Sequence, residues 1–421
     1  MPATPEQRRD FGRQRLGPLF GTFARLLDAA ARRDGVRSLV FIARDGEFLR
    51  EVLQAWQTAS GATAAPALHY ARLSRRSTNL LRHACIDAAA VDEALSVRAG
   101  APSSASVLRF LGLDLDALPP ALQARIDATA VADLLPLTAA DDFQRQLDRQ
   151  RDRLIEQLRA YLGAWGLPGA PDVAFVDIGW QGSIVRSLQQ SLCGPGERLR
   201  LYQLGHWSEA LPLPDTPAAI EGLLGDWRRG RTLREGAVYQ LALLLEAVCR
   251  EAVPPVIGYD GLAPVRPRLG DALVGADGEA SNALWREPIR AGILEAVREA
   301  ARQPALGQPG DWRRDEQRRL LRLAWFPDAA ARAAAAGLRH GEGHAQGWSV
   351  PLIAASLHRP WRSPRAWMAG LASPWRTAYL MATGGVALAG AHALLEAALL
   401  AAPAHWRTAL RDAARRFGRI G

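Results

Sequence analysis

Apolar runs of strand length alternate with segments of helical spacing along residues 5–252. The runs are short, apolar and bounded by polar turns, as is typical of strands buried on both faces: residues 37–43, 67–73, 172–176 and 198–204. Around them, apolar side chains recur at helical spacing in residues 5–33, 47–56, 184–191 and 236–252. This alternation predicts an α/β fold whose parallel sheet is covered by helices on both faces.

Two further stretches are helical in pattern but contain no strand. Residues 78–165 are mostly helical in pattern, with Pro102, Pro119 and Pro120 as breaks, and they predict a helical insertion into the core. Residues 280–337 are helical again and lead into a Gly-rich loop. We therefore expect a core of residues 1–265 with its insertion at about 78–165, a helical region of residues 266–349, and a Trp- and Arg-rich tail of residues 350–421.

Composition narrows the class of protein. The chain has 421 residues, 48% of them hydrophobic, and a net charge of +9 carried by arginine without any lysine. Such a basic chain suits a phosphorylated substrate or a membrane surface. Its basic residues are dispersed and no recognised motif appears, so we expect no nucleic-acid partner.

The cysteines and the N-terminal residues indicate the cellular compartment in which the protein is expected. The three cysteines, Cys85, Cys193 and Cys249, are far apart, which argues against a disulfide scaffold and a thiolate zinc site. The N-terminal residues contain no apolar core of a signal peptide. We expect a cytoplasmic protein.

The first candidate loop follows the apolar run that ends at Ala43. Arg44, Asp45 and Gly46 form a turn that opens a helix. The backbone N–H groups of a helix start and an arginine together favour an anion. Gly46 would let the backbone approach a ligand closely. Ser74 and Arg75 follow the next strand and belong to the same group of candidates.

The second candidate loop follows the run that ends at Asp177. Gly179, Gly182 and Ser183 make a tight turn into a helix, where free N–H groups and a hydroxyl suit a phosphate. Asp177 is suited to sugar hydroxyls or a metal-bound ligand, and Trp180 to shielding or stacking. In an open parallel sheet both loops would lie at the ligand-binding edge. A strand–Asp–Gly turn also occurs in α/β folds purely for geometry.

Two further polar residues are candidates. His206 follows a strand and would line a substrate site there, or be a packed strand end. Glu246 lies on an apolar helix, where a carboxylate is costly unless it is paired or faces solvent.

These motifs resemble a module of bacterial polysaccharide-biosynthesis proteins. The matching segments are Phe41 to Gly46 (FIARDG), Tyr70 to Arg75 (YARLSR) and Asp177 to Ser183 (DIGWQGS), with a later helix and turn from Leu243 to Tyr259. In related proteins the module is often fused to a haloacid-dehalogenase-type phosphatase and is therefore often labelled a hydrolase. The resemblance covers roughly residues 12 to 265.

The module in turn is similar to type I phosphoribosyltransferases. This resemblance implies a parallel-sheet core of that type and transfer of 5-phospho-ribofuranose from phosphoribosyl pyrophosphate (PRPP) to a lipid-linked glycan, with a separate phosphatase acting afterwards. Arg44, Asp45 and Gly46 would match the pyrophosphate loop, and Ser74 and Arg75 would lie near the leaving pyrophosphate.

The same resemblance assigns the second loop to the ribose. Asp177 would match one of the acidic pair, and Gly179, Trp180, Gln181, Gly182 and Ser183 the cradle of the 5-phosphate. Mg²⁺ is expected mainly through pyrophosphate, without dedicated protein ligands. Ile178 stands where the family has its second acidic residue, and Trp180 and Gln181 replace small hydroxyl residues.

Three other functions remain open at this point. A phosphatase of the haloacid-dehalogenase type needs a strand that ends in Asp-x-Asp, and Asp114-Leu-Asp116 lies in the helical insertion. A nucleotide-sugar glycosyltransferase often needs no such motif. A non-catalytic, membrane-associated assembly subunit is the third.

The tail raises the question of a membrane. Residues 360–376 interleave Trp with Arg, which suits the headgroup layer, and residues 406–419 form a basic amphipathic helix or an ordinary surface helix. The apolar residues 379–403 predict a buried or interfacial helix rather than a span. We expect peripheral attachment at the inner face of the membrane if the tail binds lipid.

Overall fold

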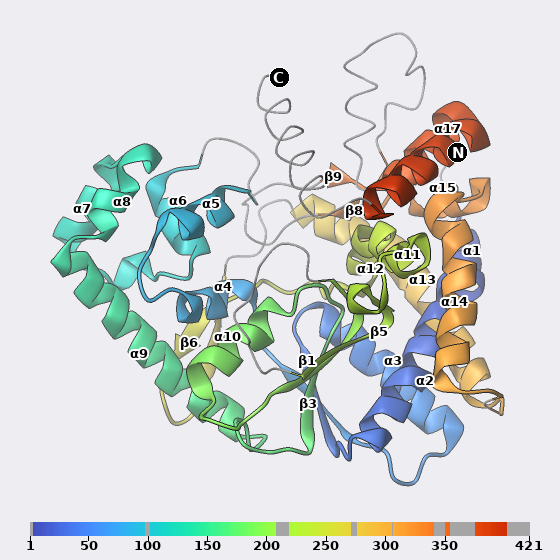
Figure 1. The fold of residues 1–421 in the computed structure, drawn as a ribbon, viewed down its shortest axis with the longest axis horizontal. Helices are drawn as coiled ribbons and strands as arrows, with labels where there is room; N and C mark the ends of the chain where they lie inside the picture. Colours follow the sequence, from blue (N-terminus) through green and yellow to red (C-terminus); the bar gives the residue numbers. More distant parts are fainter. Residues whose placement is uncertain are drawn as a thin grey trace.

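A five-stranded parallel sheet forms the centre of the molecule (Figure 1). The computed structural model describes residues 3–96, 102–207, 219–270, 276–304, 306–340, 350–353 and 375–401. The strands lie in the order β2-β1-β3-β4-β5. Their bounds are β1 Ser38–Ile42, β2 Ala67–Ala71, β3 Val173–Asp177, β4 Arg200–His206 and β5 Ala219–Asp226. The predicted α/β class and its parallel sheet are confirmed.

Alternate side chains of each central strand pack on opposite faces of the sheet. In β1, Leu39 and Phe41 belong to one buried hydrophobic cluster, whereas Val40 and Ile42 belong to a second. The first cluster includes helix α3 (Asp45–Ser60), and the second includes helix α10 (Ser183–Leu192). The two helices that leave β1 and β3 therefore cover opposite faces.

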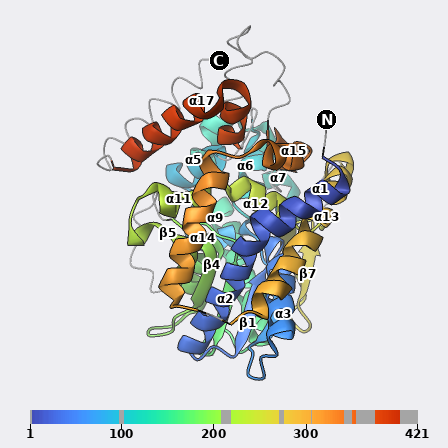
Figure 2. The same cartoon turned by 90° about the vertical axis from the view of Figure 1, so that its right-hand side faces the viewer.

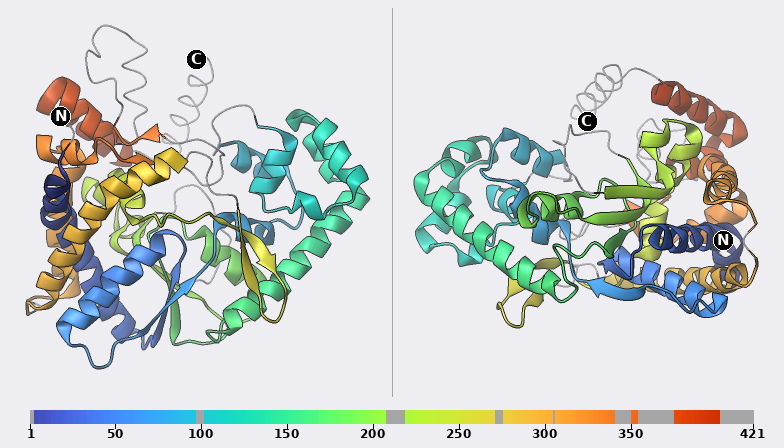
Figure 3. Two further views of the ribbon diagram at one scale, coloured as in Figure 1. Left: turned by 180° about the vertical axis from the view of Figure 1, so that it is seen from behind. Right: turned by 60° about the horizontal axis from the view of Figure 1, so that its bottom comes forward.

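The helical insertion covers the face on which α10 lies. Its longer helices form an arm on the left of Figure 1, and Figure 3 shows the same arm from behind and from below. The helices are α4 Arg75–Thr78, α5 Ala88–Ser96, α6 Ser104–Phe110, α7 Pro120–Ala128, α8 Leu134–Thr138 and α9 Asp141–Gly163. A hairpin of β6 (Val256–Asp260) and β7 (Arg266–Leu269) lies beside this arm, where β6 packs against α9 and α4.

Helices from both ends of the chain cover the other face. Figure 2 shows the N-terminal helices beside α13 and α14. The elements are α1 Pro5–Phe11, η1 Gly12–Leu16, α2 Gly17–Arg33, α11 Leu233–Gln240, α12 Ala242–Cys249, α13 Ala276–Ala301, α14 Pro309–Trp325, α15 Ala329–Ala335 and α17 Arg376–Ala401. A Cβ at Gly292 would lie 2.0 Å from the Arg9 carbonyl oxygen, so α13 crosses α1 at close range.

The C-terminal region is helical, as expected, within its described residues. A short pair of strands, β8 (Arg339–His340) and β9 (Val350–Pro351), precedes α17. The expected apolar helix is present as α17. Residues 354–374 and 402–421 lie outside the described residues, and with them most of the Trp- and Arg-rich segment and the residues 406–419 for which a helix was expected. In the described part of the chain, no helix combines the length and apolar character needed to span a bilayer.

Two elements near the sheet differ from the sequence prediction. The pattern does not predict the edge strand β5, because Gly222 and Gly225 interrupt its apolar residues. The close packing of β5 requires the first of these glycines, since a Cβ at Gly222 would lie 2.2 Å from the Gly225 carbonyl oxygen. The single helix expected over residues 236–252 is divided into α11 and α12 at Leu241.

Candidate functional site

The two candidate loops lie at the same edge of the sheet. β1 and β3 are neighbouring parallel strands, with Phe41 opposite Val176, so Arg44 and Asp177 leave the sheet side by side. The strand order also changes direction between β1 and β3. Ligands of open α/β sheets bind in the crevice that such a switch point opens at the carboxyl ends of the strands. The prediction that both loops share one edge is confirmed.

The first loop brings an arginine and an aspartate to the start of α3. Arg44 is the N-cap residue and Asp45 the first residue of the helix, and the Ala43–Arg44 peptide bond is cis. A Cβ at Gly46 would lie 3.0 Å from the backbone carbonyl carbon of Phe41. The missing side chain of Gly46 thus lets α3 approach β1, whereas the sequence suggested an approach to a ligand.

The second loop is shaped by glycines into the start of α10. Gly182 is the N-cap residue with φ of 68°, and Gly179 has φ of 152°. A Cβ at Gly179 would lie 2.6 Å from the carbonyl oxygen of Gly205 on β4. The Gly179–Trp180 peptide bond is cis. The loop therefore lies tightly against β4 while the helix N-terminus points to the edge where Arg44 lies.

The carboxyl groups of Asp45 and Asp177 influence each other. Burial, and next the charge of Asp45, raise the pKa of Asp177 to about 8. The backbone N–H of Ile178, which donates to Asp177 Oδ1 at 2.8 Å, lowers this pKa but does not offset the rise. Burial and then the charge of Glu246 raise the pKa of Asp45. Arg250, Arg44 and Arg75 act in the opposite direction on the pKa of Asp45. The carboxyl groups of Asp45, Asp177 and Glu246 therefore lie together at this edge, and we refer to them as the carboxyl cluster. The guanidinium groups of Arg44, Arg75 and Arg250 lie around this cluster.

Glu246 joins this site through α12. Its Oε1 accepts a hydrogen bond of 2.6 Å from the indole N–H of Trp180. The prediction that a carboxylate on this apolar helix needs a partner is thus met by Trp180. Arg250, one turn further on, was not predicted, although its i, i+4 spacing from Glu246 is visible in the sequence.

Helix α13 holds α12 in place. Arg290 donates hydrogen bonds of 2.8, 2.8 and 2.9 Å to the carbonyl oxygens of Val248, Cys249 and Arg250. These are carbonyl groups that the end of a helix leaves without partners. A residue from the C-terminal region thereby fixes the helix that carries Glu246.

The carboxylates of this edge are oxygen ligands of the kind that binds a divalent cation. Asp45 Oδ1 is buried and accepts no hydrogen bond from any described residue. Oxygen ligands of this type suit Mg²⁺, which commonly binds through one or two carboxylates and substrate phosphates. Among the residues that the structure describes, no three acidic, histidine or cysteine side chains form a complete metal site.

Ser74 and Arg75 have different surroundings. The Ser74 hydroxyl donates to the Val256 carbonyl oxygen at 2.6 Å and accepts from Ser77 N–H, so it caps α4. Arg75 is exposed and lowers the pKa of both Asp45 and Asp177. Of this pair, Arg75 is the residue that the structure brings to the carboxyl cluster.

Of the remaining predicted site residues, two lie on the second loop and one is buried. Gln181 is exposed and Ser183 is the first residue of α10, both on the second loop. His206 is only 1% exposed, and its Nδ1 lies 2.8 Å from Gln203 Oε1. Burial lowers the pKa of His206 to about 4. The structure therefore gives His206 the position of a packed strand end, the alternative that its sequence context left open.

The Asp-x-Asp segment lies away from the sheet edge. Asp114 precedes a 3₁₀ turn of the insertion (η3, Leu115–Ala117) and pairs with Arg268 of β7 at 2.5 Å. A haloacid-dehalogenase nucleophile would stand at a strand end, so this segment does not have that placement.

The sheet edge combines features that suit an anionic ligand with hydroxyl groups. Two helix N-termini and the arginines favour anionic groups, while the carboxyl groups are suited to hydroxyls. A scan of the sequence against models of known protein families finds no match, and neither does a search of curated proteins.

Proposed function

We propose that this chain is a glycosyltransferase of the phosphoribosyltransferase type, which transfers 5-phospho-ribofuranose from PRPP to a hydroxyl of a glycan. The observation that carries the proposal is the convergence of two loops, residues 44–46 and 177–183, at the switch point of the sheet. These motifs are far apart in the sequence but share one sheet edge, so they would serve one ligand rather than two.

The proposed donor site divides its anionic groups between two helix starts. The pyrophosphate would lie at the start of α3, near the guanidinium groups of Arg44 and Arg75. The 5-phosphate would lie in the turn of residues 179–183, at the start of α10. Backbone N–H groups at helix starts and arginine side chains are the usual ligands of phosphate. Gln181 and Ser183 are the polar side chains of that turn.

The proposed reaction forms one bond and breaks one. The acceptor oxygen bonds to C1 of the ribose while the bond from C1 to the pyrophosphate oxygen breaks, and its electron pair leaves with the pyrophosphate. The Asp45 carboxylate takes the acceptor proton, and Asp177 orients the ribose hydroxyls. Arg44 and Arg75 stabilise the negative charge that develops on the leaving group. Mg²⁺, held mainly by the pyrophosphate, would add positive charge there.

The proposed reaction also implies a further enzyme and a place in the cell. The product would carry a 5-phosphate, which a separate phosphatase removes. The acceptor would be a lipid-linked glycan on the cytoplasmic side of the membrane, and the fold would be a type I phosphoribosyltransferase core. The basic, arginine-rich composition supports an anionic substrate and an anionic surface.

Calorimetry with the purified full chain tests the donor. We expect Mg²⁺–PRPP to bind the wild type, and Arg44→Ala and Asp177→Ala each to weaken binding at least about tenfold, the loss of roughly 1.4 kcal/mol. Asp116→Asn, a change at a side chain that is 91% exposed, serves as the control. Binding of a nucleotide-sugar without binding of PRPP would overturn the proposal.

A further inference from the structure

Four aromatic rings gather beside the carboxyl cluster. Trp180 and Trp207 are stacked, with ring centroids 4.5 Å apart and an interplanar angle of 19°. Tyr239 stands nearly perpendicular to Trp207 at 4.1 Å and 82°. Trp227 lies 5.9 Å from both Trp207 and Tyr239. We refer to these four residues as the aromatic cluster.

The aromatic cluster follows the carboxyl ends of three neighbouring strands. Trp180 follows β3, Trp207 follows β4 and Trp227 follows β5, while Tyr239 belongs to α11. The indole N–H of Trp180 donates to Glu246, whose charge raises the pKa of Asp45. The rings therefore extend from the proposed donor site toward β5, the outermost strand on that side of the sheet.

Backbone contacts hold the two stacked rings. Trp207 N–H donates to the Trp180 carbonyl oxygen at 3.1 Å. A Cβ at Gly205 would lie 2.9 Å from Cζ3 of Trp180, so the absence of a side chain there makes room for the indole. The pair is thus built into the packing of β4 against the second loop.

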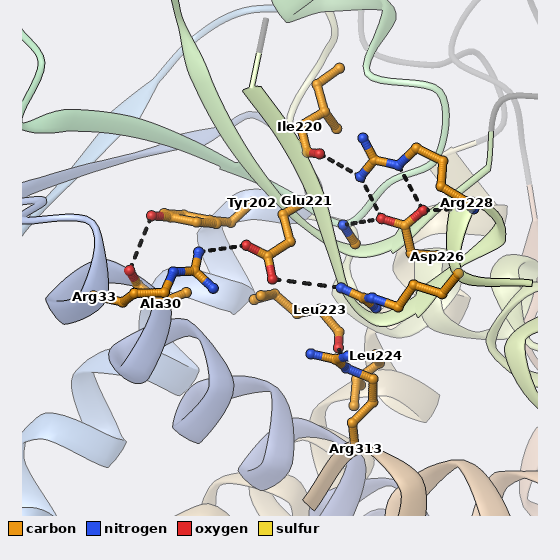
Figure 4. Close-up of polar contacts among 12 residues, drawn as sticks. Ala30, Arg33, Tyr202, Ile220, Glu221, Leu223, Leu224, Asp226, Arg228 and Arg313 are labelled. Carbon is orange, nitrogen blue, oxygen red and sulfur yellow. Dashed lines mark hydrogen bonds and ion pairs between the residues drawn. The ribbon is translucent and has the colours of Figure 1, made fainter. Parts of the chain in front are cut away.

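The turn that carries Trp227 is fixed as well. Figure 4 shows the Asp226 carboxylate facing Arg228, beside the contact of Arg228 with Ile220. Asp226 accepts hydrogen bonds from the backbone N–H of Gly222 at 3.2 Å and of Arg228 at 3.0 Å. Trp227 therefore leaves β5 in a set direction.

The rings are partly open to solvent despite their packing. Tyr239 is 44% exposed, and the three tryptophans are partly buried. The stacked pair is too close to admit a further ring between its members, so it offers no slot for a sandwiched nucleobase. Trp207 and Tyr239 instead form a corner of two nearly perpendicular rings, and Tyr239 is the more exposed of the two.

We propose that the aromatic cluster binds a sugar ring of the acceptor glycan, next to the donor site. The apolar C–H face of a pyranose packs on an aromatic face, and its equatorial hydroxyls remain free for water or polar groups. This inference rests on the proposed function, because it assigns the acceptor to the β5 side of the donor. It adds the substrate class and the residues that hold it.

Saturation-transfer NMR with methyl β-D-glucopyranoside and methyl β-D-galactopyranoside tests this site on the full chain. We expect saturation to be strongest on the protons of one sugar face. Tyr239→Ala should reduce the transfer at least about threefold, and Tyr239→Phe, which keeps the ring, should restore most of it. Phe326→Ala removes a ring that is 40% exposed elsewhere on the molecule and should leave the transfer unchanged.

Separate titrations distinguish this inference from the proposed function. If PRPP binds but neither glycoside receives saturation, the acceptor site is overturned while the donor proposal stands. Equal transfer to wild type and Tyr239→Ala also overturns it, as does transfer to the base of uridine monophosphate in place of the sugars. If the glycosides bind through Tyr239 but PRPP does not bind, the proposed function fails and the assignment to an acceptor fails with it.

Discussion

Asp177 ends a buried strand at a position where ionisation is costly. The residues before it in β3 are buried, and burial together with the charge of Asp45 raises its pKa to about 8. Its ordinary value is about 3.9. A group whose pKa is raised by folding contributes fully to stability below its unfolded pKa and loses that contribution as the pH rises toward its folded pKa. Asp177 therefore destabilises the free protein at neutral pH.

We expect Asp177→Asn to raise the melting temperature while it weakens PRPP binding. An amide does not ionise, and its oxygen is still able to accept the hydrogen bond from Ile178 N–H. The stabilisation should grow between about pH 4 and pH 8 and reach roughly 1–3 kcal/mol. Thermal unfolding followed across this pH range measures it.

An exposed aspartate provides the matched control. Asp116→Asn makes the same chemical change on a side chain that is 91% exposed, and it should leave the melting temperature and its pH dependence unchanged. A pH-independent effect of Asp177→Asn would contradict the electrostatic explanation.

At the scale of elements, the site depends on how closely α3 approaches β1. Gly46 lies in the first turn of α3, and the strand backbone at Phe41 occupies the space where a side chain would be. The close approach carries Arg44 and Asp45 to the carboxyl end of β1. The packing of α3 against β1 therefore also sets the position of the loop of residues 44–46.

We expect Gly46→Ala to lower the midpoint of urea unfolding. The added Cβ, 3.0 Å from the Phe41 carbonyl carbon, forces α3 away from β1 at a cost of about 1–3 kcal/mol. Gly163→Ala, at the end of α9, adds the same atom where nothing outside the backbone of its own helix and its chain neighbours lies within 4 Å, and it should not destabilise the protein. Equal midpoints for both variants would show that the packing of α3 against β1 accommodates the added Cβ without a cost in stability.

At the scale of the whole molecule, the site is supported by a helix from beyond the core predicted from sequence. Helix α13 packs against α1, α2 and α3, and its buried residues share one hydrophobic cluster with β1 and β3. Arg290 then reaches from α13 to the end of α12, behind Glu246. The C-terminal helices are thus part of the packing that fixes the carboxyl cluster.

We expect Arg290→Leu to destabilise the protein and to weaken PRPP binding. The change removes three hydrogen bonds to carbonyl groups, which costs about 2–4 kcal/mol because charged donors make the stronger bonds. Arg318→Leu on α14 removes a guanidinium that is 62% exposed and should have little effect. Urea unfolding and calorimetry compare the two, and unchanged PRPP affinity in Arg290→Leu would separate α13 from the site.

Local patterns were sufficient for the elements that contain continuous apolar runs. β1, β3, β4, α3 and α10 were predicted within a few residues because burial on both faces of a sheet leaves a strong signal. β2 was predicted as well, although it is an edge strand in which only Ala71 is fully buried. The signal failed for β5, where Gly222 and Gly225 serve close backbone contacts, and for β7, where Pro267 stands between two arginines. Close packing and edge position, which decide these strands, involve partners distant in the sequence.

The sequence by itself determined that Arg44 and Asp177 follow buried strands and open helices, because periodicity and glycine turns are local properties. Only the tertiary structure decided that β1 lies beside β3, which makes one site of two loops. It also decided that Trp180 meets Glu246 and that Arg290 holds α12, whereas His206 is buried at the end of β4. Strand order and side-chain pairing depend on contacts across the whole chain, and no local pattern encodes them.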